Sequence, residues 1–104
     1  MKTKKLILIV LVTMVIVFTN CTKKPIACVD SASKSGIAGQ AISFDGSCSE
    51  NAHHYQWDFG DGGSAHSASA SHVYNNSGTY TAKLKAVSKN SKKEDEKTVT
   101  VTVN

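Results

Sequence analysis

The stretch Tyr55-Gln56-Trp57-Asp58-Phe59-Gly60-Asp61-Gly62 carries an aromatic residue at every second position and ends in glycines around an aspartate. In an extended strand Tyr55, Trp57 and Phe59 point to one face, and three large rings in a row predict that this face is buried. The next residues, 60–63, are typical of a tight turn. Asp61 can accept a backbone N–H two residues on, and glycine reaches positive φ without a clash. The stretch therefore predicts a core strand that ends in a turn.

Period-2 alternation recurs on both sides of this stretch. It is clearest in Thr79–Val87 and in Thr98–Val103, which we expect to pair as antiparallel partners. The connection between them, Ser88–Lys97, holds three lysines followed by three acidic residues, a composition that suits a soluble hairpin tip. Further strands are predicted at Ile26–Asp30, at Ala41–Asp45 with Ile42 and Phe44 inward, and at His53–Phe59.

No stretch from Ile26 onward shows the i, i+3, i+4, i+7 spacing of an amphipathic helix. Short strands at regular intervals, separated by Ser, Thr, Gly and Asn, are typical of a sandwich. The predicted fold class is all-β.

The motif Y-x-W-D-F-G-D-G resembles the signature of the PKD family, and two supporting blocks follow it in the family's order and spacing. The blocks are His72-Val73-Tyr74 and Gly78-Thr79-Tyr80-Thr81. The resemblance implies an immunoglobulin-like β-sandwich of about seven strands over residues 26–104. It also implies an extracellular, non-catalytic module that acts as a spacer or contacts proteins and polysaccharides. The matching positions are Tyr55, Trp57, Asp58, Phe59, Gly60, Asp61, Gly62, His72, Tyr74, Gly78 and Tyr80.

The sequence departs from the family pattern in two places. The proline that often precedes the histidine block is absent from residues 67–71, and Ala82 and Ala86 are smaller than the usual branched residues. The small alanines predict a thinner core.

The N-terminus has the pattern of an export signal. A cationic start is followed by 13 largely apolar residues, Leu6 to Phe18, whereas a membrane-spanning helix needs about 20. We expect residues 1–20 to be a lipoprotein-type signal peptide, because Cys21 follows the apolar run and resembles the lipidated cysteine of a bacterial lipobox. Phe18 and Asn20 stand where the lipobox typically has Leu and Gly or Ala. An ordinary secretory peptide or an uncleaved short anchor is the alternative.

Three cysteines in an exported chain leave one unpaired after a single disulfide forms. Lipidation of Cys21 would account for it, and Cys28 and Cys48 would then form a disulfide in an oxidising compartment. Free thiols or a metal site remain the alternatives, although the spacing lacks the C-x-x-C pattern of zinc sites. The resemblance also implies this pair, since family members in lipoproteins often carry one. Residues 21–25 would be a short tether that keeps the domain close to the membrane.

The chain has 104 residues, enough for one domain, and a net charge of +4. Its 12 basic residues are all lysine, and three of them, Lys2, Lys4 and Lys5, precede the apolar run. Nine lysines and eight acidic residues remain beyond that run. A near-neutral charge, no arginine for bidentate contacts and an export signal exclude nucleic acid as the expected partner.

No nucleophile, base and orienting acid stand together in the motifs, and no G-x-S-x-G is present, so we predict that the chain is not an enzyme. Adjacent His53 and His54 would point to opposite faces of a strand, which disfavours zinc. Calcium is better motivated at Asp58 and Asp61, and the nearby oxygen ligands considered with them are Asp45, Glu50 and Asn51. The favoured interpretation is that the two aspartates accept backbone N–H groups and hold the turn, with no cofactor.

Two functions are consistent with these features. The first is a lipid-anchored module of the bacterial cell envelope, facing the periplasm or on the cell surface, that binds a protein or glycan partner in adhesion. The second is a structural spacer or assembly subunit of an envelope complex, with no ligand of its own. The row of Tyr55, Trp57 and Phe59 weakens glycan binding, because buried rings cannot stack on sugars.

Overall fold

The computed structural model describes residues 22–104. The predicted signal segment 1–20 and the predicted lipidation site Cys21 lie outside the described residues. No helix in the described part of the chain is long and apolar enough to cross a membrane.

Seven strands form two sheets, which confirms the predicted all-β sandwich. The five-stranded sheet has the order β1-β7-β6-β3-β4, and the two-stranded sheet pairs β2 with β5. All pairings are antiparallel except β1 with β7, which is parallel. The strands are β1 (Ser33–Gly36), β2 (Ala41–Asp45), β3 (His54–Asp58), β4 (Ser64–Ala65), β5 (Ser69–Val73), β6 (Gly78–Val87) and β7 (Glu94–Val103).

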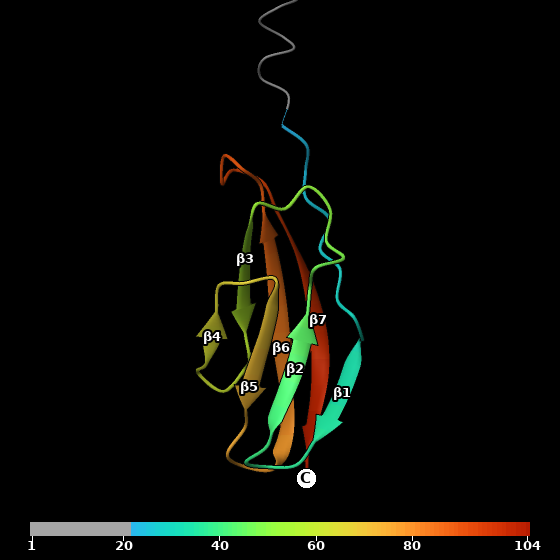
Figure 1. Ribbon diagram of the computed structural model, residues 1–104, viewed down its shortest axis with the longest axis vertical. Coiled ribbons are helices and arrows are strands. Elements are labelled where there is room, and N and C mark those ends of the chain that lie inside the picture. The colour runs from blue at the N-terminus through green and yellow to red at the C-terminus, as the bar shows by residue number, and fades with distance from the viewer. Residues whose placement is uncertain (1–21) are drawn as a thin grey trace, which may run out of the picture.

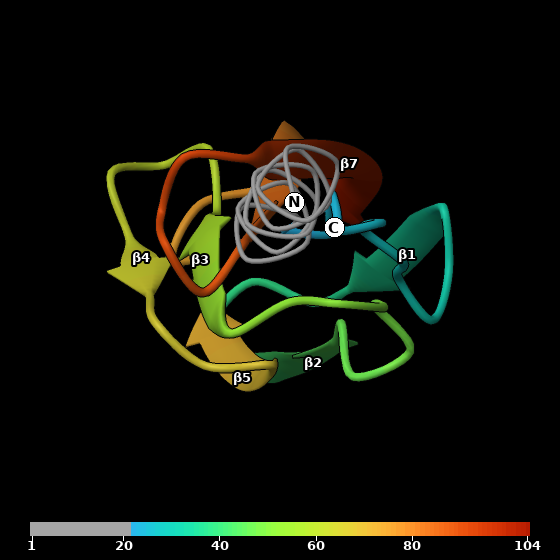
Figure 2. The same ribbon diagram turned by 90° about the horizontal axis from the view of Figure 1, so that it is seen from above.

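The two sheets lie face to face. Figure 2 shows the β2–β5 pair as a separate layer opposite β3 and β7. Figure 1 shows that residue 22 enters at the same end as the β6–β7 turn, whereas the C-terminal end of β7 lies at the opposite end. The sandwich is elongated. One end holds residue 22 and the β6–β7 turn, and the other holds the C-terminal end of β7.

The core lies between the sheets and is built by the inward side chains of alternating strands. Ile42 and Phe44 of β2 are buried, as predicted, and Leu84 of β6 is fully buried between the layers. The buried residues of β7 are all valine. The cluster comprises Ile42, Phe44, Trp57, Phe59, Tyr74, Ala82, Leu84, Val99, Val101 and Val103.

The predicted strand Ile26–Asp30 is wrong. This segment forms only an isolated bridge between Ile26 and Glu50, and the first strand begins at Ser33. Two of its N–H groups donate to side chains instead of to the backbone of a neighbouring strand. Ala27 donates to the Asp95 carboxylate (2.8 Å), and Cys28 donates to the Ser49 hydroxyl (2.9 Å).

The predicted connection between the last two strands, Ser88–Lys97, is longer than the observed one. The pairing of the two strands is confirmed, but β7 begins at Glu94, so the turn is only Ser88–Lys93. Glu94 and Glu96 at the start of β7 face lysines of β6, with Lys83–Glu96 at 3.6 Å and Lys85–Glu94 at 3.8 Å. Opposite charges across an antiparallel pair stabilise it, which explains why this charged segment is strand.

The predicted disulfide is present between Cys28 and Cys48, with 5.4 Å between their Cα atoms. It joins the segment before β1 to the loop after β2. The same two segments are joined by the reciprocal backbone hydrogen bonds of Ile26 and Glu50 (2.9 and 3.0 Å). The first described residues are thus fastened to the sandwich.

Candidate functional site

The turn after β3 is held by its two aspartates. The Asp58 carboxylate accepts the Gly60 N–H and the Asp61 carboxylate accepts the Gly63 N–H, both at 3.0 Å. Gly60 has φ of 82° and would place a Cβ 2.5 Å from the Thr81 carbonyl oxygen, so only glycine fits there. The tight turn predicted from the sequence is therefore built by side chain to backbone hydrogen bonds.

His72 of β5 fastens this turn to the other sheet. Its Nε2 lies 2.8 Å from Asp61 Oδ2, and its ring stacks on Phe59 with 4.3 Å between centroids. The edge of Tyr74 meets the same ring at 4.7 Å, and the Tyr74 hydroxyl donates to the Phe59 carbonyl at 2.9 Å. The first two signature blocks thus form one cluster across the sandwich.

Two groups in this cluster titrate abnormally. Partial burial disfavours the Asp61 carboxylate, but the hydrogen bonds from His72 and Gly63 outweigh it and lower the pKa of Asp61. Burial, followed by the charges of nearby groups that include Asp61, raises the pKa of Tyr74 to about 12. The cluster therefore favours an ionised aspartate and a neutral tyrosine.

The third signature block closes the β5–β6 connection. The Tyr80 hydroxyl donates to the Asn76 carbonyl at 2.8 Å, and the ring packs against Tyr74 with 4.5 Å between centroids. Gly78 has φ of 150° and lies against the Tyr80 ring. This block therefore supports the fold.

The oxygen ligands considered for calcium are not brought together. Asp45 accepts hydrogen bonds from Ser47 and Ser69, and Glu50 pairs with the first described segment. Within residues 22–104 no three His, Cys, Asp or Glu side chains are grouped as a metal site would require. The grouping of Asp45 and Glu50 with the aspartates of the turn was wrong, and the geometry gives Asp58 and Asp61 a turn-holding role.

The aromatic rings are turned inward. Trp57, Phe59, Phe44 and Tyr74 are at most 1% exposed, and the Trp57 indole N–H donates to the Ala68 carbonyl at 3.3 Å. The predicted burial of the strand's aromatic row is confirmed for Trp57 and Phe59, whereas Tyr55 is half-buried. No large exposed ring is available in the described sandwich to stack on a sugar.

A groove runs between β1 and β2, the strands that end the two sheets on the same side of the sandwich. The sequence did not predict it, because β1 is short, serine-rich and without apolar alternation. Gly36 forms part of its wall, where an added Cβ would lie 2.7 Å from Ile42. The lining is largely hydroxyl, amide and ammonium groups: Ser31, Ser33, Ser35, Ser43, Gln40 and Lys34.

The described residues do not assemble a catalytic centre around the groups considered from the sequence. Cys28 and Cys48 are joined in a disulfide, so neither offers a thiolate. His72 is bonded to Asp61 rather than to a nucleophile.

The comparisons with known proteins agree with this geometry. A family model described as PKD domain matches residues 22–103. Collagenase ColA of Clostridium perfringens is 40% identical over 75 residues, which are 68% of this chain and 7% of the collagenase. The chain thus spans only a small part of the curated relatives that it matches.

Two solved structures share the fold. One, described as the structural basis for the promiscuous specificity of carbohydrate-binding modules from the β-sandwich superfamily, has a TM-score of 0.70 and 26% identity, over 81% of this chain and 36% of that one. The other is the PKD1 domain of Vibrio anguillarum Epp, with a TM-score of 0.64 and 24% identity, over 81% of this chain and 98% of that one.

Proposed function

The chain belongs to the PKD domain family, and we propose that it is a non-catalytic module held in the bacterial cell envelope by a lipid on Cys21, where it binds a protein or glycan partner. The sequence pattern around Cys21 supports the anchor. The Cys28–Cys48 disulfide supports an exported location, because such bonds persist in oxidising compartments.

The anchor can be tested separately from binding. Cells that express the full chain are grown with an alkyne fatty acid, and the protein is labelled through the alkyne. We expect label on the native chain and none on Cys21→Ser. Label that remains on Cys21→Ser would refute lipidation at this position.

The observation that carries the binding function is the groove between β1 and β2. Each of these strands pairs with another strand on one side only, so the groove lies between two strand edges that no further strand covers. Its serine hydroxyls, the Gln40 amide and the Lys34 ammonium can donate to carbonyl or hydroxyl oxygens. With the aromatic rings buried, recognition here would rest on hydrogen bonds, which suits an extended peptide or a polar glycan.

The carbohydrate-binding modules among the structural neighbours support a glycan as one of the two partner classes. A glycan array and a panel of extracellular-matrix and envelope proteins would separate the two classes.

A matched pair of variants tests the groove. Ser43 lines it, whereas Ser71, its cross-strand partner on β5, does not. Both serines are exposed, so arginine at either site should leave the fold intact. We expect Ser43→Arg to weaken binding of the identified partner about tenfold or more and Ser71→Arg to leave it unchanged. Equal binding by both variants would show that the partner does not bind in the groove.

The second function is a structural spacer or assembly subunit with no ligand of its own. It is favoured by the small share of the collagenase that this chain matches, because such a segment can serve to separate larger parts. A spacer predicts no retention on any glycan or protein of the panel. An assembly subunit predicts one envelope protein that co-purifies in fixed stoichiometry, whether or not Ser43 is replaced.

A further inference from the structure

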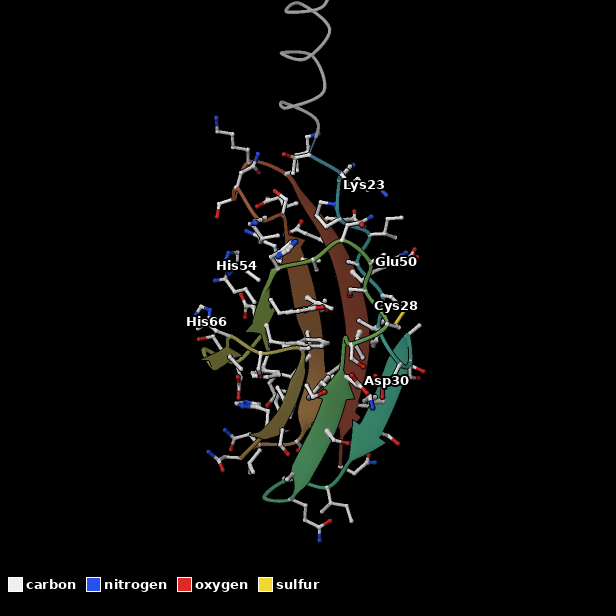
Figure 3. The ribbon with its side chains drawn as sticks, turned by 45° about the horizontal axis from the view of Figure 1, so that its top comes forward. Lys23, Cys28, Asp30, Glu50, His54 and His66 are labelled. Carbon is white, nitrogen blue, oxygen red and sulfur yellow. A yellow bond between two sulfur atoms is a disulfide. The ribbon has the colours of Figure 1, made fainter. Side chains whose placement is uncertain are left out.

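Five of the nine lysines of the described chain lie at the end where residue 22 enters the sandwich. Lys23 and Lys24 lie in the entering segment, and Lys89, Lys92 and Lys93 lie in the β6–β7 turn. All five side chains are exposed. Figure 1 shows that these two segments share one end of the sandwich, and Figure 3 shows Lys23 there.

The acidic groups near this end are fewer, and two of them are engaged. Glu94 pairs with Lys85, and the Asp95 carboxylate accepts the Ala27 N–H. That backbone hydrogen bond is the largest contribution that lowers the pKa of Asp95. With Glu50, three acids face five lysines, so the end carries about two excess positive charges.

The opposite half of the sandwich is nearly free of charge. Residues 35–44, 70–82 and 98–104 include no lysine, aspartate or glutamate. Since nine lysines and eight acids are distributed over residues 22–104, the near-neutral total hides a charge difference along the long axis of the sandwich. The positive end is the one at which the chain continues toward Cys21.

The lysine turn is fixed beside the entering segment. Lys93 Nζ donates to the Thr22 carbonyl, and the Asn90 amide donates to the Thr22 hydroxyl at 3.3 Å. Lys23 and Lys89 line a common hollow together with His53. The turn itself is closed by Ser88, which is buried and whose hydroxyl accepts the Lys93 N–H at 3.1 Å.

We propose that this lysine end, defined by Lys23, Lys24, Lys89, Lys92 and Lys93, is the face with which the module contacts a membrane surface rich in anionic lipid. The inference rests on the proposed lipid anchor, because a lipid on Cys21 would hold residue 22 at the headgroups and press the adjacent lysines against them. Each lysine close to an anionic surface strengthens attachment by about fivefold. The lysine end would then contact the bilayer, and the end with few charges would be directed away from it.

Amide hydrogen exchange, read by mass spectrometry, tests this contact. The protein is isolated from membranes with its native N-terminus and added to vesicles of phosphatidylcholine alone or with about 30% phosphatidylglycerol. We expect exchange in residues 22–24 and 88–93 to slow by about threefold or more on the anionic vesicles only. Exchange in residues 36–40, at the far end, should not change. Salt at about 0.5 M should remove the difference, because it screens exposed charges.

Two variants with equal charge change localise the effect. Lys89→Gln/Lys92→Gln should abolish the protection, and Lys83→Gln/Lys97→Gln, at exposed positions of β6 and β7, should retain it. Lys93 is left in place because it bonds to Thr22. Loss of protection in both variants would overturn the inference, since it would show a dependence on total charge alone.

Other outcomes would also overturn it. Equal protection on both kinds of vesicle would show that anionic lipid is not recognised and would leave an acidic protein as the partner of this end. Protection by inorganic phosphate without vesicles would show a small-anion site. The mass of the N-terminal peptide shows in the same experiment whether Cys21 carries a lipid. A lipidated protein without protection refutes only this inference, and an unlipidated protein with protection refutes only the anchor.

Discussion

At the scale of single residues, the signature motif works by joining the two sheets. Asp61 shapes its own turn and also holds His72, a residue eleven positions later on the other sheet. The sequence identified His72 as part of the signature, but it did not identify Asp61 as its partner. Only the crossing of β5 over the turn brings the two side chains together.

Loss of His72 should weaken the fold at this junction. His72→Ala removes the stack on Phe59 and leaves Asp61 without its side-chain donor, so we expect the free energy of unfolding to fall by about 1–2 kcal/mol. Urea unfolding measures this change. His66→Ala, in an exposed loop position, is the matched control and should stay within about 0.5 kcal/mol of the native protein.

Acid should weaken the fold through Asp61. Its folded pKa lies below the unfolded value of about 3.9. The stabilisation is therefore fully present above the unfolded pKa and is lost as the pH falls through the folded pKa. Asp61→Asn should reduce the loss of stability between about pH 5 and pH 2, measured by urea unfolding across that range. An unchanged pH dependence in this variant would contradict the role given to Asp61.

The two glycines of the turn should differ in their tolerance of a side chain. Gly60→Ala meets the Thr81 carbonyl and also has positive φ, so a loss of about 2 kcal/mol or more is expected. Gly62→Ala has φ of 97° but no atom within 4 Å of its new Cβ, so only the backbone strain of about 1 kcal/mol remains. Thermal unfolding compares the stability of the two variants. Equal losses would show that the contact with the Thr81 carbonyl adds nothing to the cost of the substitution.

At the scale of strands, alternation was informative where one face is buried. The prediction of Ala41–Asp45 matches β2, because Ile42 and Phe44 alternate with polar residues. The strands β1, β4 and β5 were missed, since their half-buried positions carry no large apolar side chain that would contrast with the exposed serines. Those positions hold Lys34, Gly36, Ala65, Ala70 and His72. Their pairing depends on neighbours supplied by distant parts of the chain.

The segment before β1 should depend on its disulfide. Cys28→Ser/Cys48→Ser opens a link between residues separated by 20 positions, and the expected loss is about 3 kcal/mol in the chain-entropy model. Thermal unfolding of this variant should match that of the native protein under reducing conditions. A variant as stable as the oxidised protein would show that the hydrogen bonds of Ile26 and Glu50 suffice.

At the scale of the whole molecule, one core serves both sheets. Leu84 lies on a central strand of the larger sheet, and its Cδ2 approaches Gly46 of the loop after β2, where an added Cβ would clash with it. A small sandwich with a close-packed core of aromatic rings and valines has little volume to spare around such a residue.

Leu84→Ala should therefore cost about 2–5 kcal/mol of unfolding free energy. Denaturant unfolding followed by fluorescence of Trp57 and by circular dichroism should give coincident transitions, because both sheets share the core. Ile37→Ala is the control, since Ile37 is 56% exposed, and it should cost less than about 1 kcal/mol. Separate transitions for the two probes would contradict a single core.

The all-β class, the buried aromatic strand, the signature turn and the β6–β7 pairing could be deduced from the amino-acid sequence, because each depends on local alternation or on turn chemistry. The His72–Asp61 bond, the groove beside the serine-rich β1 and the lysine end could not. These features join residues that are distant in sequence, and their positions follow from how the two sheets pack. Charge illustrates the difference. The net charge beyond the apolar run is near zero, but the fold places the lysines of the β6–β7 turn beside residue 22, so that one end is positive.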